Sequence, residues 1–241
     1  MTMHMRSGIG VFNNAKYFVL LLCFASASCV SNMKYYDFKA GARFPGGSIK
    51  ISEFEGGCEI YIGPNFGVDG TFPNINENLA AVFEQAANDA DRRNCTSRTV
   101  LLNSSGGLVN EAMKIGRLIR MRGYDTKLPL SNQCSSSCGL IFIAGVKRTV
   151  LTRTVGDNSR AGFHQLSTIG PDGKKICIEP TAAASQNFYK YAKEMLPARS
   201  AAIFHSWAMR TECNSIAEAN VDALLSSGIA TDSKPFALFS R

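Results

Sequence analysis

The stretch Asn103-Ser104-Ser105-Gly106-Gly107-Leu108 decides the fold class of this 241-residue chain, because it joins an expected strand to an expected helix. Residues 98–102 before it form a short β-branched and aliphatic run, which is typical of a buried strand in a mainly parallel sheet. Residues 108–122 after it carry an apolar stripe with helical spacing and end at Gly123. Backbone N–H groups at such a strand-to-helix turn can hold an anion or a developing oxyanion. The alternative is a tight turn without chemistry.

Two further segments carry the residue types of nucleophilic catalysis. Gln133-Cys134-Ser135-Ser136-Ser137-Cys138-Gly139 places three serines at the start of an expected buried helix, and residues 160–165 end in a His-Gln pair. A serine hydroxyl needs a neighbouring base, and acyl transfer needs N–H donors for the carbonyl oxygen. The intervals from Gly107 to Ser136 and from Ser136 to His164 are 136 − 107 = 29 and 164 − 136 = 28 residues. The alternative readings are a helix N-cap cluster and a packed histidine.

Together the three segments resemble the ClpP/crotonase superfamily of serine peptidases. In ClpP-like sequences a strand ends in a Gly-Gly turn, a small-residue segment carries the nucleophile, and a short strand ends in a His-Gln or His-Ser pair. The resemblance covers about residues 58–165 and is closest to secreted, periplasmic ClpP-like proteins of bacteria, whose serine is bracketed by two cysteines. It implies an α/β fold with a helix-covered, mainly parallel sheet of repeated β-β-α units and C-terminal helices.

The resemblance also implies a role for each residue of the central site. Ser136 is the expected nucleophile and His164 the expected base. The backbone N–H groups of Gly107 and Ser137 are the expected oxyanion donors, with Gly106 beside them in the substrate-binding turn.

The third member of the catalytic triad is less well specified by the sequence. The family places an acid in the C-terminal helical region, and counting back from residues 226–230 leads to Glu212, with Asn214 and Asp222 as alternatives. Such a group holds the imidazole in the correct tautomer. Ser105 replaces the proline that usually precedes Gly-Gly in the family, but both glycines are kept.

The first 27 residues are expected to be a secretory signal peptide. They combine a positive leader, an apolar run at residues 17–24 and the small-x-small cleavage site Ala25-Ser26-Ala27. The alternatives are an uncleaved N-terminal membrane anchor and a lipid-modified Cys29. We therefore expect an exported, periplasmic protein, either soluble or anchored as a lipoprotein.

Cysteine usage agrees with export. Of eight cysteines, one lies in the leader, and an oxidising compartment would let six of the other seven pair as three disulfides of open connectivity. Cys134 and Cys138 can clamp the serine segment by pairing with each other, with Cys177 or with Cys213. The alternative is that they are buried small residues. No Cys-x-x-Cys pair occurs and only three histidines exist, so we do not expect a zinc site. The proposed chemistry implies no other metal and no cofactor.

The charge distribution argues against a nucleic-acid partner. The chain has 26 basic and 19 acidic residues, a net charge of +7, and without Arg6 and Lys16 of the leader the excess is 24 − 19 = +5. No Lys/Arg block or nucleic-acid motif concentrates this charge.

The rest of the chain is read as alternating strands and helices in one domain. We expect an extended lead-in at 28–47, a domain at 48–235 and a tail at 236–241. The expected strands are 48–54, 58–62, 126–130 and 149–151, residues 67–73 and 166–180 are expected loops, and the expected helices are 79–90 after a cap at Asn74 or Asn76, 182–195, 197–210 and 216–225.

These patterns lead to one functional hypothesis with two alternatives. We expect a serine endopeptidase or related hydrolase that acts on peptides or protein segments and forms a homo-oligomer. The first alternative is an inactive ClpP-fold envelope protein that serves as a binding or assembly module. The second is a crotonase-type acyl-thioester site, which would not need the pair Ser136 and His164.

Overall fold

A computed structural model describes residues 34–37, 47–54, 56–64, 74–130, 133–152 and 160–235. The chain divides into Met1–Met33 and Lys34–Arg241, and all described residues belong to the second unit. The expected signal peptide, the loop at 67–73 and the tail at 236–241 lie outside the described residues, as does most of the lead-in.

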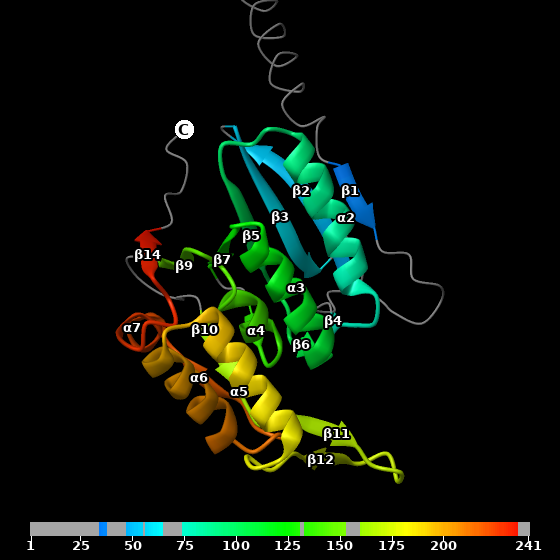
Figure 1. Ribbon diagram of the computed structural model, residues 1–241, viewed down its shortest axis with the longest axis vertical. Helices are drawn as coiled ribbons and strands as arrows, with labels where there is room; N and C mark the ends of the chain where they lie inside the picture. The colour runs from blue at the N-terminus through cyan, green and yellow to red at the C-terminus, as the bar shows by residue number, and fades with distance from the viewer. Residues whose placement is uncertain are drawn as a thin grey trace, which may run out of the picture. The chain divides into compact units, whose positions relative to one another are not determined.

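The main sheet of this unit has seven strands and is mainly parallel, as predicted (Figure 1). The first two pairs in the sheet are antiparallel and the four that follow are parallel. In spatial order the strands are β1 (Lys34–Asp37), β2 (Gly47–Phe54), β3 (Gly57–Pro64), β5 (Arg98–Leu102), β7 (Asp125–Leu128), β9 (Arg148–Thr152) and β14 (Asp232–Pro235).

Two amphipathic helices, α2 (Leu79–Arg92) and α3 (Val109–Met121), run side by side over the sheet (Figure 1). Their apolar stripes are buried, because α2 packs on β2 and β3 while α3 packs on α2 and on the short helix α4 (Cys138–Phe142). The expected side-chain cap of α2 was wrong. The N-cap is Asn78, and the carboxylate of Glu111 from α3 accepts from the backbone N–H of Ala80 instead.

The described residues also contain three smaller groups of strands. A three-stranded sheet contains β8 (Gln133–Ser135), β10 (Arg160–Phe163) and β13 (Ala217–Ala219), with β10 in the middle. The pair β4 (Asn74–Ile75) and β6 (Gly106–Gly107) is parallel, and β11 (Ser167–Ile169) and β12 (Lys175–Cys177) form an antiparallel hairpin.

The C-terminal region packs against the small sheet through aromatic rings. Helices α5 (Ala183–Met195) and α6 (Ala198–Arg210) contact each other, and Phe163 of β10 meets Phe204 of α6 edge-on with ring centroids 5.5 Å apart. Two expectations were wrong here. Residues 217–219 pair with β10, so the last helix, α7, spans only Val221–Ser226, and the expected loop at 166–180 contains the β11–β12 hairpin.

Three disulfides join the six paired cysteines: Cys58–Cys95, Cys134–Cys138 and Cys177–Cys213. Three such bonds indicate an oxidising compartment. Within the part of the chain that the structure describes, none of the helices has the length and apolar character needed to cross a membrane.

Candidate active site

The serine segment makes a sharp turn between a strand and a helix. Strand β8 ends at Ser135 and α4 begins at Cys138, and Ser136 between them has φ of 57°. This left-handed conformation is uncommon for a residue other than glycine and is frequently found at functional sites. Ser135 and Ser137 are buried at 4% and 3% exposure, whereas Ser136 is partly exposed. Of the three serines, only Ser136 can therefore present its hydroxyl to a substrate.

The Gly-Gly turn is fastened to this segment by backbone and side-chain hydrogen bonds. Ser104 N–H donates to the carbonyl of Gln133 at 2.7 Å, and Ser104 O accepts from Ser135 N–H at 3.0 Å. The Ser104 hydroxyl in turn accepts from Gly106 N–H at 3.1 Å. These bonds hold the loop after β5 in a fixed position against strand β8.

Gly106 is glycine because Ser136 lies against it. Its φ is 104°, and a Cβ atom there would come within 2.6 Å of Ser136 Cβ and 3.1 Å of Ser136 Oγ. The backbone of the turn therefore packs directly against the side chain of Ser136.

Gly107 is the exposed second glycine of the same turn. The neighbouring Leu108 N–H, not that of Gly107, donates to the carbonyl of Ile75 at 2.6 Å in the pairing of β4 with β6. A Cβ on Gly107 would come within 2.3 Å of that carbonyl oxygen, so a larger residue does not fit. Gly107 is exposed, and its N–H suits the predicted role of an oxyanion donor.

The small sheet brings His164 to the same edge as Ser136. Strands β8 and β10 are parallel neighbours with Gly162 opposite Ser135, and Ser136 N–H donates to Gly162 O at 2.8 Å. Ser136 follows the last residue of β8, and His164 follows the last residue of β10. Because the carboxyl ends of parallel strands meet at one edge, both residues leave the sheet together.

The imidazole of His164 is half-buried, and its protonation state follows from its contacts. Nδ1 lies 2.6 Å from the main-chain carbonyl of Gln165. A carbonyl can only accept, so Nδ1 carries the proton and Nε2 is the basic nitrogen. Burial lowers the pKa of His164, its bond to Gln165 opposes this shift, and the charge of Lys175 lowers the pKa further. The ring is therefore kept neutral and able to accept a proton.

The three candidates for a third triad member lie on the surface of the C-terminal region. Glu212 and Asn214 are exposed and follow α6, and Asp222 is exposed in the first turn of α7. The backbone carbonyl of Glu212 accepts from Ser215 N–H at 2.9 Å. The orienting role of any of these side chains stays a prediction.

A groove of about 770 Å³ opens beside the Gly-Gly turn. We call it the site groove. Its walls come from the start of α3, the β11–β12 hairpin region and the start of α5, and its apolar lining includes Gly107, Leu108, Met113, Leu166, Ile178 and Ala184.

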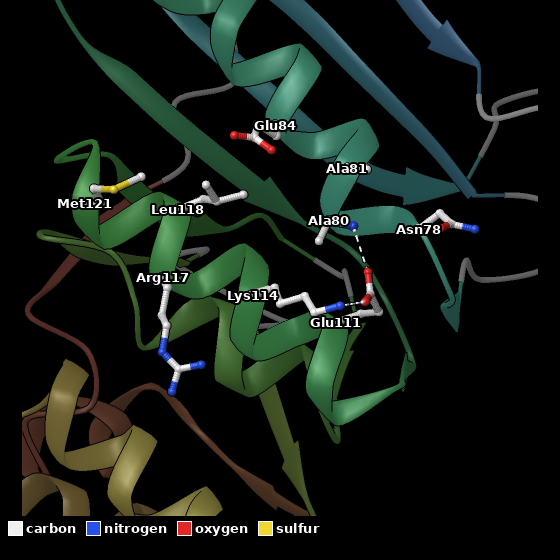
Figure 2. A pocket seen from close by; sticks show the side chains of 9 residues that line it. All are labelled: Asn78, Ala80, Ala81, Glu84, Glu111, Lys114, Arg117, Leu118 and Met121. Atoms are coloured by element: carbon white, nitrogen blue, oxygen red, sulfur yellow. Dashed lines mark hydrogen bonds and ion pairs between the residues drawn. The ribbon is translucent and has the colours of Figure 1, made fainter.

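A second hollow, of about 480 Å³, lies between α2 and α3 on the other side of Glu111. Figure 2 shows the Glu111 carboxylate joined to the backbone nitrogen of Ala80 and to the ammonium of Lys114, at 3.1 and 2.7 Å. Burial raises the pKa of Glu111, but the bonds to Lys114 and Ala80 and the charge of Lys114 together outweigh it, so the pKa lies below its usual value. The carboxylate therefore caps the N-terminus of α2 in its ionised form.

Sequence reasoning missed three contributors to the site. The Ser104 hydroxyl and the Gln165 carbonyl act through local geometry, which residue types do not encode. The third contributor, the β11–β12 hairpin, did have a signal. Gly170-Pro171-Asp172-Gly173 is a turn sequence, and it lies between two short runs with β-forming residues.

No protein-family model matches the chain, and no curated protein matches it in sequence. Solved structures do match it. The membrane-bound stomatin-specific protease 1510-N, in a mutant form, aligns over 67% of this chain and 75% of its own with 14% identity and a TM-score of 0.53. An enoyl-CoA hydratase from Mycobacterium marinum aligns over 78% of this chain and 77% of its own with 9% identity and a TM-score of 0.50.

The chain has the ClpP/crotonase fold. A second mutant form of 1510-N, in complex with a substrate peptide, agrees, with a TM-score of 0.52 over 67% of this chain and 71% of its own at 15% identity. Likeness at this identity concerns the fold alone, and the fold is shared by a protease and a hydratase. The chemistry of this chain must therefore be argued from its own residues.

Proposed function

We propose that the chain is an exported serine hydrolase of ClpP type that cleaves peptides or protein segments with Ser136 and His164. The observation that carries the proposal is the conformation of Ser136: a left-handed, partly exposed serine between two buried serines, with Gly106 against its side chain. The strained turn holds the hydroxyl out of the packed segment, as nucleophile turns of other serine hydrolases do.

The proposed reaction is acyl transfer in two halves. Ser136 Oγ attacks the carbonyl carbon of the substrate while its proton passes to Nε2 of His164. The negative oxygen is stabilised by the N–H groups of Gly107 and Ser137. As the C–N bond breaks, Nε2 returns the proton to the leaving amine. Water then attacks the acyl-enzyme with the same base, and the second product leaves as a carboxylic acid.

The site groove supports a peptide as the substrate. Gly107 is one of its lining residues, so a chain bound in it would pass beside one of the two proposed oxyanion donors. Its volume of about 770 Å³ is within the range of about 300–1,000 Å³ that is usual for ligand sites. The neighbour 1510-N is described as a protease and was solved with a substrate peptide, which agrees with this choice.

The proposed location is the periplasm. The signal-like segment at residues 1–27 and the three disulfides support export. The proposal includes attachment to the membrane, either through the leader or through a lipid on Cys29. It also includes assembly into a homo-oligomer.

The test is labelling of the oxidised mature protein with a fluorophosphonate probe, followed by peptide mapping. We expect an adduct on Ser136 that is lost in Ser136→Ala and strongly reduced in His164→Ala. If the folded, oxidised wild type stays unlabelled, the hydrolase proposal fails, and the inactive binding module takes its place.

A further inference from the structure

The bond between His164 and Gln165 belongs to a chain of contacts that ends at a disulfide. Gln165 N–H donates to the carbonyl of Thr211 at 2.8 Å, so the peptide group next to the imidazole is tied to the segment after α6. Cys213, two residues beyond Thr211, is bonded to Cys177 of β12. The segment that holds Gln165 is therefore itself covalently attached to the β11–β12 hairpin.

Hydrogen bonds also join strand β12 of the hairpin to Cys213. Cys213 N–H donates to Cys177 Sγ at 3.2 Å, and the ammonium of Lys175 donates to Cys213 O. On the other side of Gln165, Leu166 O accepts from Ile178 N–H at 2.8 Å. The main chain that carries the Gln165 carbonyl is thus held at the N–H of Gln165 itself and at the carbonyl of the next residue. The partners, Thr211 and Ile178, lie two residues from Cys213 and one residue from Cys177, so both supports lead to the Cys177–Cys213 bond.

We propose that the main-chain carbonyl of Gln165 is the group that orients His164, and that the Cys177–Cys213 disulfide positions this carbonyl. The inference rests on the proposed Ser136–His164 function and names its third component. A carbonyl oxygen is a pure acceptor, so it selects the Nδ1–H tautomer as a carboxylate would. It carries no full charge, so its contribution is the tautomer and the angle of the ring, more than stabilisation of the imidazolium.

The competing arrangement uses a carboxylate, with Glu212 as the first candidate. Glu212 lies between Thr211 and Cys213, and its side chain is exposed. In this segment it is the main chain, not this side chain, that binds Gln165. The two arrangements are chemically distinct, because one depends on a titratable side chain and the other on the covalent support of a loop.

A matched pair of disulfides makes the inference testable. Cys177 and Cys213 are 36 residues apart, and Cys58 and Cys95 are 37 apart, so removing either bond frees a loop of nearly the same length. The Cys58–Cys95 bond joins β3 to the segment before β5 and shares no residue with the His164 contacts.

The experiment compares Cys177→Ala/Cys213→Ala with Cys58→Ala/Cys95→Ala by the rate of fluorophosphonate labelling at Ser136. Both labelling rates are measured under conditions in which circular dichroism shows that each variant is fully folded. We expect the rate of the first variant to fall at least about 10-fold, since small misplacements of a catalytic group cost this much or more. We expect the second to stay within about 2-fold of wild type. Equal rates in the two variants would overturn the positioning role.

Lys175→Gln gives a second readout that keeps the disulfide and a donor for Cys213 O. Among the described residues, Lys175 is the charged group that acts on the His164 ring, and its charge lowers the pKa of His164. The acid limb of the labelling rate should therefore move to higher pH in this variant. An unmoved limb would mean that Lys175 does not lie close enough to the imidazole in solution to act on it, and would count against the support from the hairpin.

Glu212→Gln decides between the two orienting groups. A fall of about 1,000-fold or more would assign the role to the carboxylate and overturn the inference. A wild-type protein that is not labelled at all fails the proposed function instead, so the two failures can be told apart.

Discussion

Replacing Gly106 by alanine is the sharpest test of the site geometry. Gly106 has φ of 104°, and a Cβ atom there would lie 2.6 Å from Ser136 Cβ and 2.8 Å from the carbonyl oxygen of Ser135. Both atoms belong to the turn that presents the proposed nucleophile. The added methyl group must therefore push the serine segment away from the Gly-Gly turn, or push the turn out of place.

The size of the effect follows from these distances. Ordinary van der Waals contact of a Cβ begins at 3.4 Å, so the contact with Ser136 must open by 3.4 − 2.6, about 0.8 Å. A misplacement of about 1 Å can lower the rate of a positioned reaction roughly 100-fold. The left-handed backbone adds about 1–2 kcal/mol of strain. We therefore expect Gly106→Ala to lose one to two orders of magnitude in the labelling rate and to unfold at lower temperature.

Gly123→Ala is the matched control. Gly123 also has a positive φ, of 69°, but no atom lies within 4 Å of a Cβ built there. The Gly123→Ala variant should therefore carry the backbone strain without a steric clash. Its melting temperature should fall by about 2–8 °C for a domain of this size, and its labelling rate should not change. The assay is the second-order rate of fluorophosphonate labelling at Ser136, measured beside a thermal melt. If both variants are labelled at the wild-type rate, close packing of the turn on Ser136 is irrelevant to the chemistry.

Three further outcomes are expected from the rest of the molecule. Gly116→Ala should lower the free energy of unfolding, because its Cβ would lie 1.7 Å from the buried hydroxyl of Tyr191, which donates to Leu140 O. A denaturant titration measures this change. An unchanged midpoint would contradict the packing around Gly116. Removing both Cys58 and Cys95 should lower the free energy of unfolding by about 4 kcal/mol, because the disulfide restricts the unfolded chain. A loss below about 1 kcal/mol would contradict the presence of this bond. Burial lowers the pKa of His205 in the folded state below 6.5, its value in the unfolded chain. The unfolded state therefore binds a proton first as the pH falls. The contribution of His205 to stability is complete above pH 6.5 and is lost as the pH falls through the folded-state pKa. His205→Gln should therefore flatten the fall in stability from pH 7.5 to 5, and an equally steep fall would show that His205 is not responsible.

The elements that the sequence predicted well are those whose signal is local. The helices at 108–122, 182–195 and 197–210 were expected from apolar spacing, and they lie at Val109–Met121, Ala183–Met195 and Ala198–Arg210. A helix forms its hydrogen bonds within one segment, so one segment carries enough information to locate it.

Strands that pair across long separations in the chain were harder to predict. Residues 217–219 look like part of a helix, yet they form β13 because the edge of β10, more than fifty residues earlier, is there to pair with. Strand β14 (Asp232–Pro235) likewise exists through its ladder with β9. Short segments have weak preferences of their own, and the partner strand decides their conformation.

The disulfides show the same division. The sequence determined that six cysteines can pair, but six cysteines allow 15 pairings. Which thiols meet depends on how the chain folds, and only the tertiary structure selects Cys58–Cys95, Cys134–Cys138 and Cys177–Cys213.

For the candidate site, the sequence alone determined the residue types and their spacing, and hence the hypothesis that Ser136, His164 and the Gly-Gly turn act together. The tertiary structure decided the geometry that this hypothesis needs: the left-handed turn at Ser136, the contact of Gly106 with it, and the bond from His164 to Gln165. The chemistry of each side chain follows directly from the residue type at that position. The contact between the Gly-Gly turn and the serine segment joins residues about thirty positions apart, so it arises only when the chain folds.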